Sequence, residues 1–148
     1  MHKVILVVGT TADYIQWIRL ACPGRALFLT APGIRRSAQE ECPASGEEIL
    51  VDLADRGEVF EALGAHLKRW DQVIQGVFSF DCESMALTAA IADKWGLDYP
   101  SETAIQNCRD KYVSKQIWAG SGIRCPKVLP IQTLSDVLAF FHSLPSGC

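Results

Sequence analysis

Short apolar runs alternate with amphipathic segments over the first hundred residues. The runs are Lys3–Val8, Ala26–Thr30, Glu48–Leu53 and Val73–Phe80. They are rich in β-branched and aromatic residues, and turn-forming or polar residues follow them, which is typical of buried strands. Strands separated by helical patterns predict a parallel sheet with right-handed crossovers. Residues 1–100 are therefore expected to form an α/β domain, a Rossmann-like parallel sheet sandwich.

The helices of this domain follow from the spacing of apolar residues and from capping residues. Val59, Phe60, Leu63 and Leu67 share one face, which predicts a helix over about 57–70. Asp81 stands where an N-cap is expected for a second helix that ends at Trp95, before Gly96. The polar stretch 33–48 predicts a long surface connection.

The character of the sequence changes after Pro100. Ser101 predicts a short helix to about Asn107, a second helix follows over 110–119, and 128–131 is expected to be a short strand. Thr133 and Asp136 match a capping box that opens a last helix. The strand expected over 128–131 and the helix that follows it cannot bury their apolar faces well by themselves. Residues 101–148 are thus predicted to be the truncated start of a second subdomain, unless they dock on the sandwich.

Composition narrows the class of protein. The 148 residues carry 14 Lys and Arg against 17 Asp and Glu, a formal charge of −3, which argues against a nucleic-acid binder. The longest apolar run near the N-terminus is far shorter than the roughly 20 residues of a membrane span. The six cysteines show no tight framework and no C-x-x-C pair. We expect a reduced, cytoplasmic protein without a structural zinc site.

Two carboxylates, Asp81 and Glu83, follow the fourth apolar run, at the edge where open α/β sheets bind ligands. Such carboxylates can meet a substrate amine or a metal-bound nucleotide, or they can simply favour the start of the next helix. The turn at Gly9 lacks the other glycines of a dinucleotide fingerprint. Cys82 and Cys108 are alternative nucleophiles, but no histidine lies near Cys82 in the sequence, which favours a structural role.

A local reversal of charge marks residues 103–131. Five basic residues stand there against Asp110 alone, a local charge of +4. A solvated surface explains this charge in general, but Lys111 begins a predicted helix, where a lysine opposes the helix dipole. A flexible ammonium group is a good partner for a polyphosphate, so Lys111 is a candidate phosphate-binding residue.

The order of motifs over residues 73–131 resembles ATP-grasp enzymes. The matching segments, in order, are Phe78–Glu83, the helix Met85–Trp95, Gly96–Pro100, Ser101–Ala104, Arg109–Lys111 and Ala119–Pro126. Residues 1–72 agree with the pre-ATP-grasp domain in their order of strands and helices. Within the superfamily, the motifs of this sequence are similar to those of carboxylate–amine ligases of the amino-acid ligase type and of carbamoyl-phosphate-synthase-like proteins.

The resemblance implies an activity and a set of partners. Such enzymes use ATP and Mg²⁺ to phosphorylate a carboxylate, and an amine then attacks the acyl phosphate. Lys111 matches the family residue that contacts the nucleotide phosphates, and Glu83 lies where substrate is bound in relatives. The partners implied are a small carboxylate, a small amine and a second copy in a homodimer, with no nucleic acid or membrane.

The family's core catalytic apparatus, including its metal ligands, is expected beyond Cys148, so we assign no catalytic residue and no metal site to this chain. We expect an inactive N-terminal fragment of an ATP-dependent ligase. A stand-alone Rossmann-like module that binds a small ligand or a protein is the alternative, and a cysteine-based redox or acyl-transfer enzyme is a third hypothesis.

Overall fold

The computed structural model describes residues 1–144. The chain divides into two compact units, Met1–Ile105 and the residues from Gln106 onward, and each is described by itself. Cys148, one of the six cysteines discussed above, lies outside the described residues.

The first unit is built on a four-stranded parallel sheet with the order β3-β2-β1-β4. Its strands are β1 (His2–Val8), β2 (Ala26–Thr30), β3 (Glu48–Leu50) and β4 (Gln72–Ser79). In the register of the sheet, Val7 is paired with Phe28 on one side and with Phe78 on the other. The predicted α/β fold with a Rossmann-like parallel sheet is confirmed.

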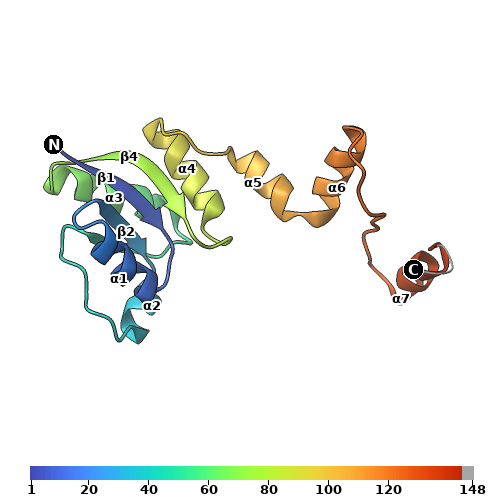
Figure 1. Cartoon of the computed structure of the whole chain (residues 1–148), viewed down its shortest axis with the longest axis horizontal. Helices are drawn as coiled ribbons and strands as arrows, with labels where there is room; N and C mark the ends of the chain where they lie inside the picture. The colour runs from blue at the N-terminus through green and yellow to red at the C-terminus, as the bar shows by residue number, and fades with distance from the viewer. Residues whose placement is uncertain (145–148) are drawn as a thin grey trace. The chain divides into compact units, whose positions relative to one another are not determined.

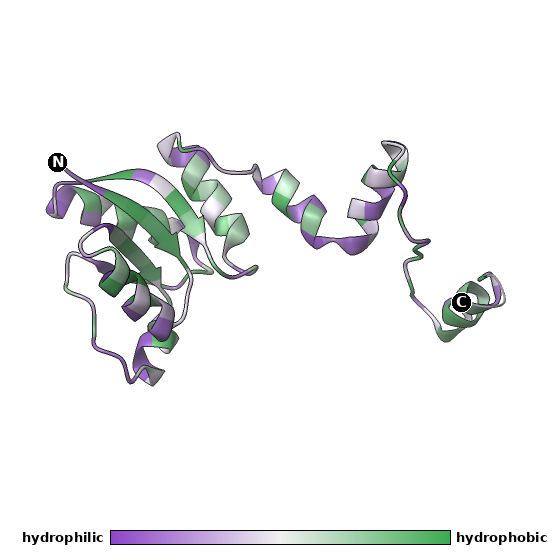
Figure 2. Cartoon of the chain, viewed as in Figure 1, coloured by the Kyte–Doolittle hydropathy of each residue, from purple (hydrophilic) through white to green (hydrophobic). Residues whose placement is uncertain are grey.

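Helices cover both faces of this sheet (Figure 1). They are α1 (Ala12–Ala21), α3 (Arg56–Arg69) and α4 (Met85–Trp95), and a short helix, α2 (Pro32–Ser37), lies in the connection after β2. The larger core joins the sheet to α3 and α4 through fully buried side chains such as Leu6, Leu63 and Ile91. A smaller core under α1 contains Ile15 and Phe28. The strands are accordingly the most continuous hydrophobic segments in Figure 2.

Local signals explain the helix ends. The side chain of Asp55 accepts a hydrogen bond from the Glu58 amide at 3.0 Å and caps α3. Gly96 ends α4 in the left-handed conformation, with φ of 64°, as expected for this position. The third strand is shorter than predicted, and α2 lies within the stretch that was predicted to be only a surface connection.

The predicted start of α4 is wrong by one turn. Its N-cap is Ser84, not Asp81. Asp81 lies in the turn that precedes the helix. Its Oδ1 accepts a hydrogen bond from the Ser84 amide at 2.5 Å, and this bond closes the turn.

The C-terminal part consists of helices joined by irregular segments. They are α5 (Glu102–Arg109), which runs across the boundary between the units, α6 (Lys111–Gly120) and α7 (Leu134–His142). Ser101 Oγ accepts from the Ala104 amide at 3.2 Å, and the Thr133–Asp136 capping box is present, so both predicted helix starts are confirmed.

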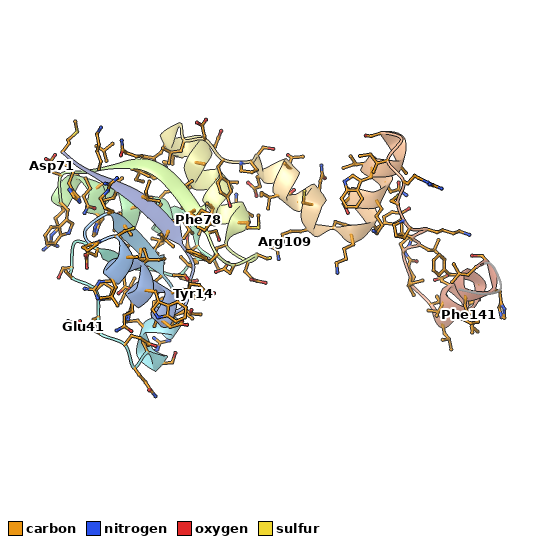
Figure 3. The ribbon with its side chains drawn as sticks, in the orientation of Figure 1. Tyr14, Glu41, Asp71, Phe78, Arg109 and Phe141 are labelled. Carbon is orange, nitrogen blue, oxygen red and sulfur yellow. The ribbon has the colours of Figure 1, made fainter. Side chains whose placement is uncertain are left out.

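The strand predicted over 128–131 is wrong, since these residues have no regular secondary structure. Pro130 removes one backbone donor, and the described residues of the second unit contain no strand with which this segment could pair. The apolar face of α7 is also uncovered, with Leu134 and Phe141 both exposed (Figure 3 labels Phe141).

Candidate functional site

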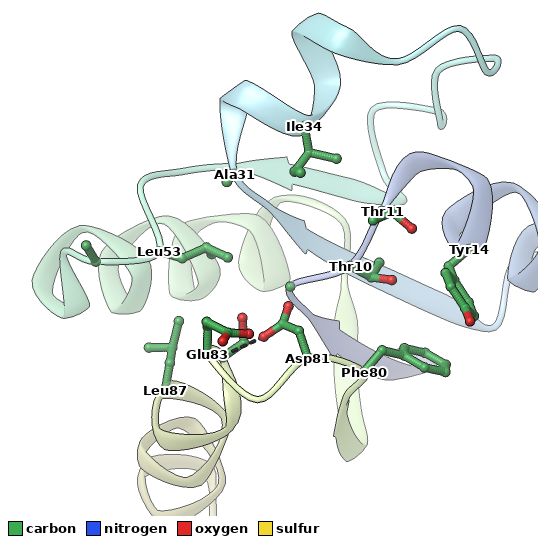
Figure 4. A pocket seen from close by; sticks show the side chains of 13 residues that line it. Thr10, Thr11, Tyr14, Ala31, Ile34, Leu53, Phe80, Asp81, Glu83 and Leu87 are labelled. Atoms are coloured by element: carbon green, nitrogen blue, oxygen red, sulfur yellow. Dashed lines mark hydrogen bonds between the residues drawn. The ribbon is translucent and has the colours of Figure 1, made fainter. Parts of the chain in front are cut away.

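A cavity of about 530 Å³ lies in the first unit, at the carboxyl ends of the strands (Figure 4). Residues that follow each of the four strands line it. The lining residues are Gly9, Thr10, Thr11, Tyr14, Ala31, Ile34, Leu53, Ala54, Phe80, Asp81, Glu83, Ser84 and Leu87. The carboxyl edge is where open α/β sheets bind their ligands, so this cavity is the candidate site.

The loop after β1 approaches the loop after β4 closely. Gly9 has a φ of 63°, a conformation that L side chains rarely adopt. A Cβ atom on Gly9 would lie 2.6 Å from Asp81 Oδ2 and 2.8 Å from Ser84 Cβ. Both the backbone conformation and the contact therefore require glycine at this position.

The loop after β4 is fixed by its own polar groups. Besides the bond from Asp81 to the Ser84 amide, Ser79 Oγ donates to the Asp81 carbonyl at 2.9 Å. Thr88 Oγ1, fully buried on α4, donates to the Ser84 carbonyl at 2.8 Å. These bonds hold the position from which Glu83 lines the cavity. The structure thus places Glu83 at the candidate site, and its role with substrate stays a prediction.

Most of the wall is apolar. Ile34, Leu53 and Leu87 line one part of the cavity, and Tyr14 and Phe80 line another (Figure 4). The rings of Tyr14 and Phe80 have centroids 5.2 Å apart, within the range of favourable aromatic contacts. These residues are apolar and carry no sequence motif of a site, although each lies after a strand or near the start of a helix at the carboxyl edge.

Two hydroxyl groups of the loop after β1 differ in their bonding. Thr11 Oγ1 donates to the Asp13 carboxylate, and this bond lowers the pKa of Asp13 below its usual value. The Thr10 hydroxyl, by contrast, is buried without a hydrogen-bond partner in the described structure, and only 8% of Thr10 is exposed. Because a buried polar group without a partner costs free energy, Thr10 is a candidate ligand contact.

The charged side chains of the cavity have one sign. Asp81 and Glu83 are both acidic, and no Lys, Arg or His is found among the described residues that line the cavity. The described part of the chain also holds no cluster of three or more His, Cys, Asp or Glu side chains that fits a metal ion.

Lys111, the predicted phosphate contact, is the first residue of α6 in the second unit and is exposed. Asp110 caps this helix and accepts from the amides of Tyr112 and Val113 at 2.9 and 3.0 Å. The capping carboxylate therefore occupies the first amides of the helix, and a contact between Lys111 and a phosphate stays a prediction.

Two further predictions concern the cysteines and a membrane span. No disulfide joins Cys22, Cys42, Cys82, Cys108 or Cys125 in the described structure. None of the helices within residues 1–144 is long and apolar enough to cross a membrane.

Comparison with known proteins shows a similarity of fold to a solved structure. No family model and no curated protein matches the chain. Among solved structures, the chain is similar to an L-amino acid ligase from Bacillus licheniformis, with a TM-score of 0.65 and 18% sequence identity. The match covers 92% of this chain and 34% of that ligase, so the chain spans about a third of its length. At this identity the similarity concerns the fold, and it confirms the fold predicted from the sequence resemblance.

Proposed function

We propose that the chain is the N-terminal portion of an ATP-dependent carboxylate–amine ligase with amino-acid substrates. The observation that carries the proposal is the similarity of fold to an L-amino acid ligase over 92% of the chain. The order of sequence motifs over residues 73–131 supports it independently.

The chemistry of such a ligase requires an activated carboxylate. Hydroxide is a poor leaving group, so ATP first converts the carboxylate to an acyl phosphate, and the amine then displaces phosphate. Cationic groups and Mg²⁺ offset the charge on the transferring phosphoryl group. In this proposal Lys111 contacts the phosphates through its ammonium group, and Glu83 contacts substrate at the cavity.

The chain supplies only part of this machinery. Residues 1–144 contain no cluster of acidic or histidine side chains that fits a metal ion, so they do not fit the role of a magnesium site. We therefore assign no step through the metal to this chain, and we expect the 148 residues alone to be inactive. In the cell we place the whole ligase in the cytoplasm, where free thiols persist, as a homodimer.

The test traps the activated intermediate. The complete polypeptide that the gene encodes is incubated with ATP, Mg²⁺, mixed amino acids and hydroxylamine, which converts an acyl phosphate to a stable hydroxamate. The proposal predicts a hydroxamate formed together with ADP. A polypeptide that consumes no ATP with any of the amino acids would contradict it.

A free-standing binding module is the second candidate function. It is favoured by one observation, namely that the first unit alone supplies every residue that lines the cavity. Reading the gene beyond codon 148 separates the two. A continuing frame supports the ligase, and an immediate stop codon supports the module.

A further inference from the structure

We propose that the cavity at the carboxyl edge of the sheet binds an apolar ligand through a protonated amino group. Glu83 and the Thr10 hydroxyl are the polar contacts of this site. The identification of this ligand as a substrate of the ligase rests on the proposed function, but the binding chemistry does not.

The negative charge of the side chains that line the cavity indicates which polar group the ligand carries. Both charged residues of the cavity are carboxylates, Asp81 and Glu83, and no basic side chain offsets them among the described lining residues. Such a site repels phosphate and carboxylate groups and attracts an ammonium group.

The volume of the cavity and its apolar lining residues indicate the size and the apolar part of the ligand. The volume of about 530 Å³ lies in the range of small-molecule sites. Ile34, Leu53 and Leu87 offer aliphatic contact, which favours a ligand with a branched apolar side chain. A ligand that consists of an ammonium group alone leaves this apolar surface in contact with water.

The carboxylates of Asp81 and Glu83 have different structural roles. Asp81 already accepts the Ser84 amide and lies against Gly9, so it positions the loop. No hydrogen bond or ion pair is found for Glu83 among the described residues, which leaves its carboxylate available to a ligand. The buried hydroxyl of Thr10 adds an independent indication, because it lines the same cavity and lacks a partner that a bound ligand would supply.

Two other ligand classes fit less well. A nucleotide needs cationic groups or a glycine-rich loop around its phosphates, and the cavity offers Gly9 alone. A divalent cation prefers a set of several oxygen ligands, and no such cluster exists in the described structure.

Three matched probes test the proposal on the 148-residue chain by titration of its ¹⁵N–¹H spectrum. Leucinamide carries the amino group and the branched side chain, 4-methylpentanamide lacks only the amino group, and glycinamide lacks only the side chain. The titration is run at about pH 6.5, below the pKa of an α-amino group. Leucinamide is expected to shift the amide signals of Gly9, Thr10 and Ser84 at millimolar concentration. The other two probes should bind about tenfold more weakly, as loss of a charge-assisted bond or of a buried side chain predicts.

Variants separate a ligand contact from a general charge effect. Glu83→Gln keeps the size of the side chain and should weaken leucinamide binding about tenfold. Glu61→Gln, an exposed residue of α3 outside the cavity, removes the same charge and should change nothing.

Equal binding of leucinamide and 4-methylpentanamide, shifts confined to signals away from the cavity, or no shift at all would overturn the proposal. Each of these results leaves ATP-dependent hydroxamate formation by the complete polypeptide unaffected, so this proposal and the ligase proposal fail separately.

Discussion

Gly9 and Asp81 lie so close that a methyl group on Gly9 would be 2.6 Å from Asp81 Oδ2. The two residues belong to the loops that follow β1 and β4, which are paired strands of the sheet, and both residues line the cavity. Their contact sets the distance between the loops, and so the geometry of the cavity depends on the absence of a side chain at position 9.

Gly9→Ala should therefore destabilise the first unit and distort the cavity. The positive φ alone costs about 1–2 kcal/mol for a residue with a Cβ atom, and the clash with Asp81 and Ser84 adds to this. Urea unfolding measures the loss. Gly24→Ala is the matched control, because Gly24 has a φ of 65° and nothing within 4 Å of an added Cβ. Equal losses for both variants would show that the close contact has no energetic effect.

Asp55→Ala tests the cap of α3. The variant removes the acceptor for the Glu58 amide at the start of the helix that packs Val59 and Leu63 into the larger core. Loss of an N-cap costs about 0.5–2 kcal/mol, to be read from the urea midpoint. Asp55→Asn keeps an acceptor and should lose much less, whereas an unchanged midpoint for Asp55→Ala would argue against the cap.

His66 should make the first unit less stable in mild acid. Burial lowers the pKa of His66 below its ordinary value, although its contact with the Gly46 carbonyl opposes this effect. The unfolded chain therefore binds a proton more readily than the folded chain, and the free energy of unfolding falls as the pH drops below about 6.5.

His66→Gln removes this titration. Urea midpoints between pH 8 and pH 5 should fall less steeply for the variant than for the parent chain, because other groups titrate equally in both. Identical slopes would show that His66 does not titrate differently on folding.

Lys111→Ala tests the phosphate contact in the complete polypeptide. A hydrogen bond to a charged group contributes about 1.5–3 kcal/mol, so the KM for ATP should rise about tenfold to a hundredfold. Lys115→Ala is the control on the same helix, since the Lys115 ammonium lies 5.4 Å from the Trp118 ring centroid and no phosphate role is assigned to it. A change of less than twofold for Lys111→Ala would remove the assignment.

Local signals in the sequence predicted most of the fold. The buried strands β1 and β2 and the helix over 56–69 follow from hydrophobic runs and spacing, and the Thr133 capping box is a short-range pattern. The strand predicted over 128–131 was wrong because a β-branched and apolar segment becomes a strand only where another strand pairs with it.

The candidate site was predicted only in part. Glu83 was found because a carboxylate in the loop after a strand indicates a ligand contact by its chemistry. Ile34 and Leu53 lie equally near the ends of β2 and β3 but are apolar, so only the order β3-β2-β1-β4 shows that they share a cavity with Glu83. Nothing in the sequence indicated Thr10 as a ligand contact, since only the folded chain shows that its hydroxyl is buried without a partner.

The measurement that tests the central claim most directly is product analysis with the complete polypeptide, ATP, Mg²⁺ and pairs of amino acids. Mass spectrometry should detect a dipeptide, formed together with equal amounts of ADP and inorganic phosphate. Absence of any dipeptide while the polypeptide is folded, or formation of AMP in place of ADP, would contradict a ligase that acts through an acyl phosphate.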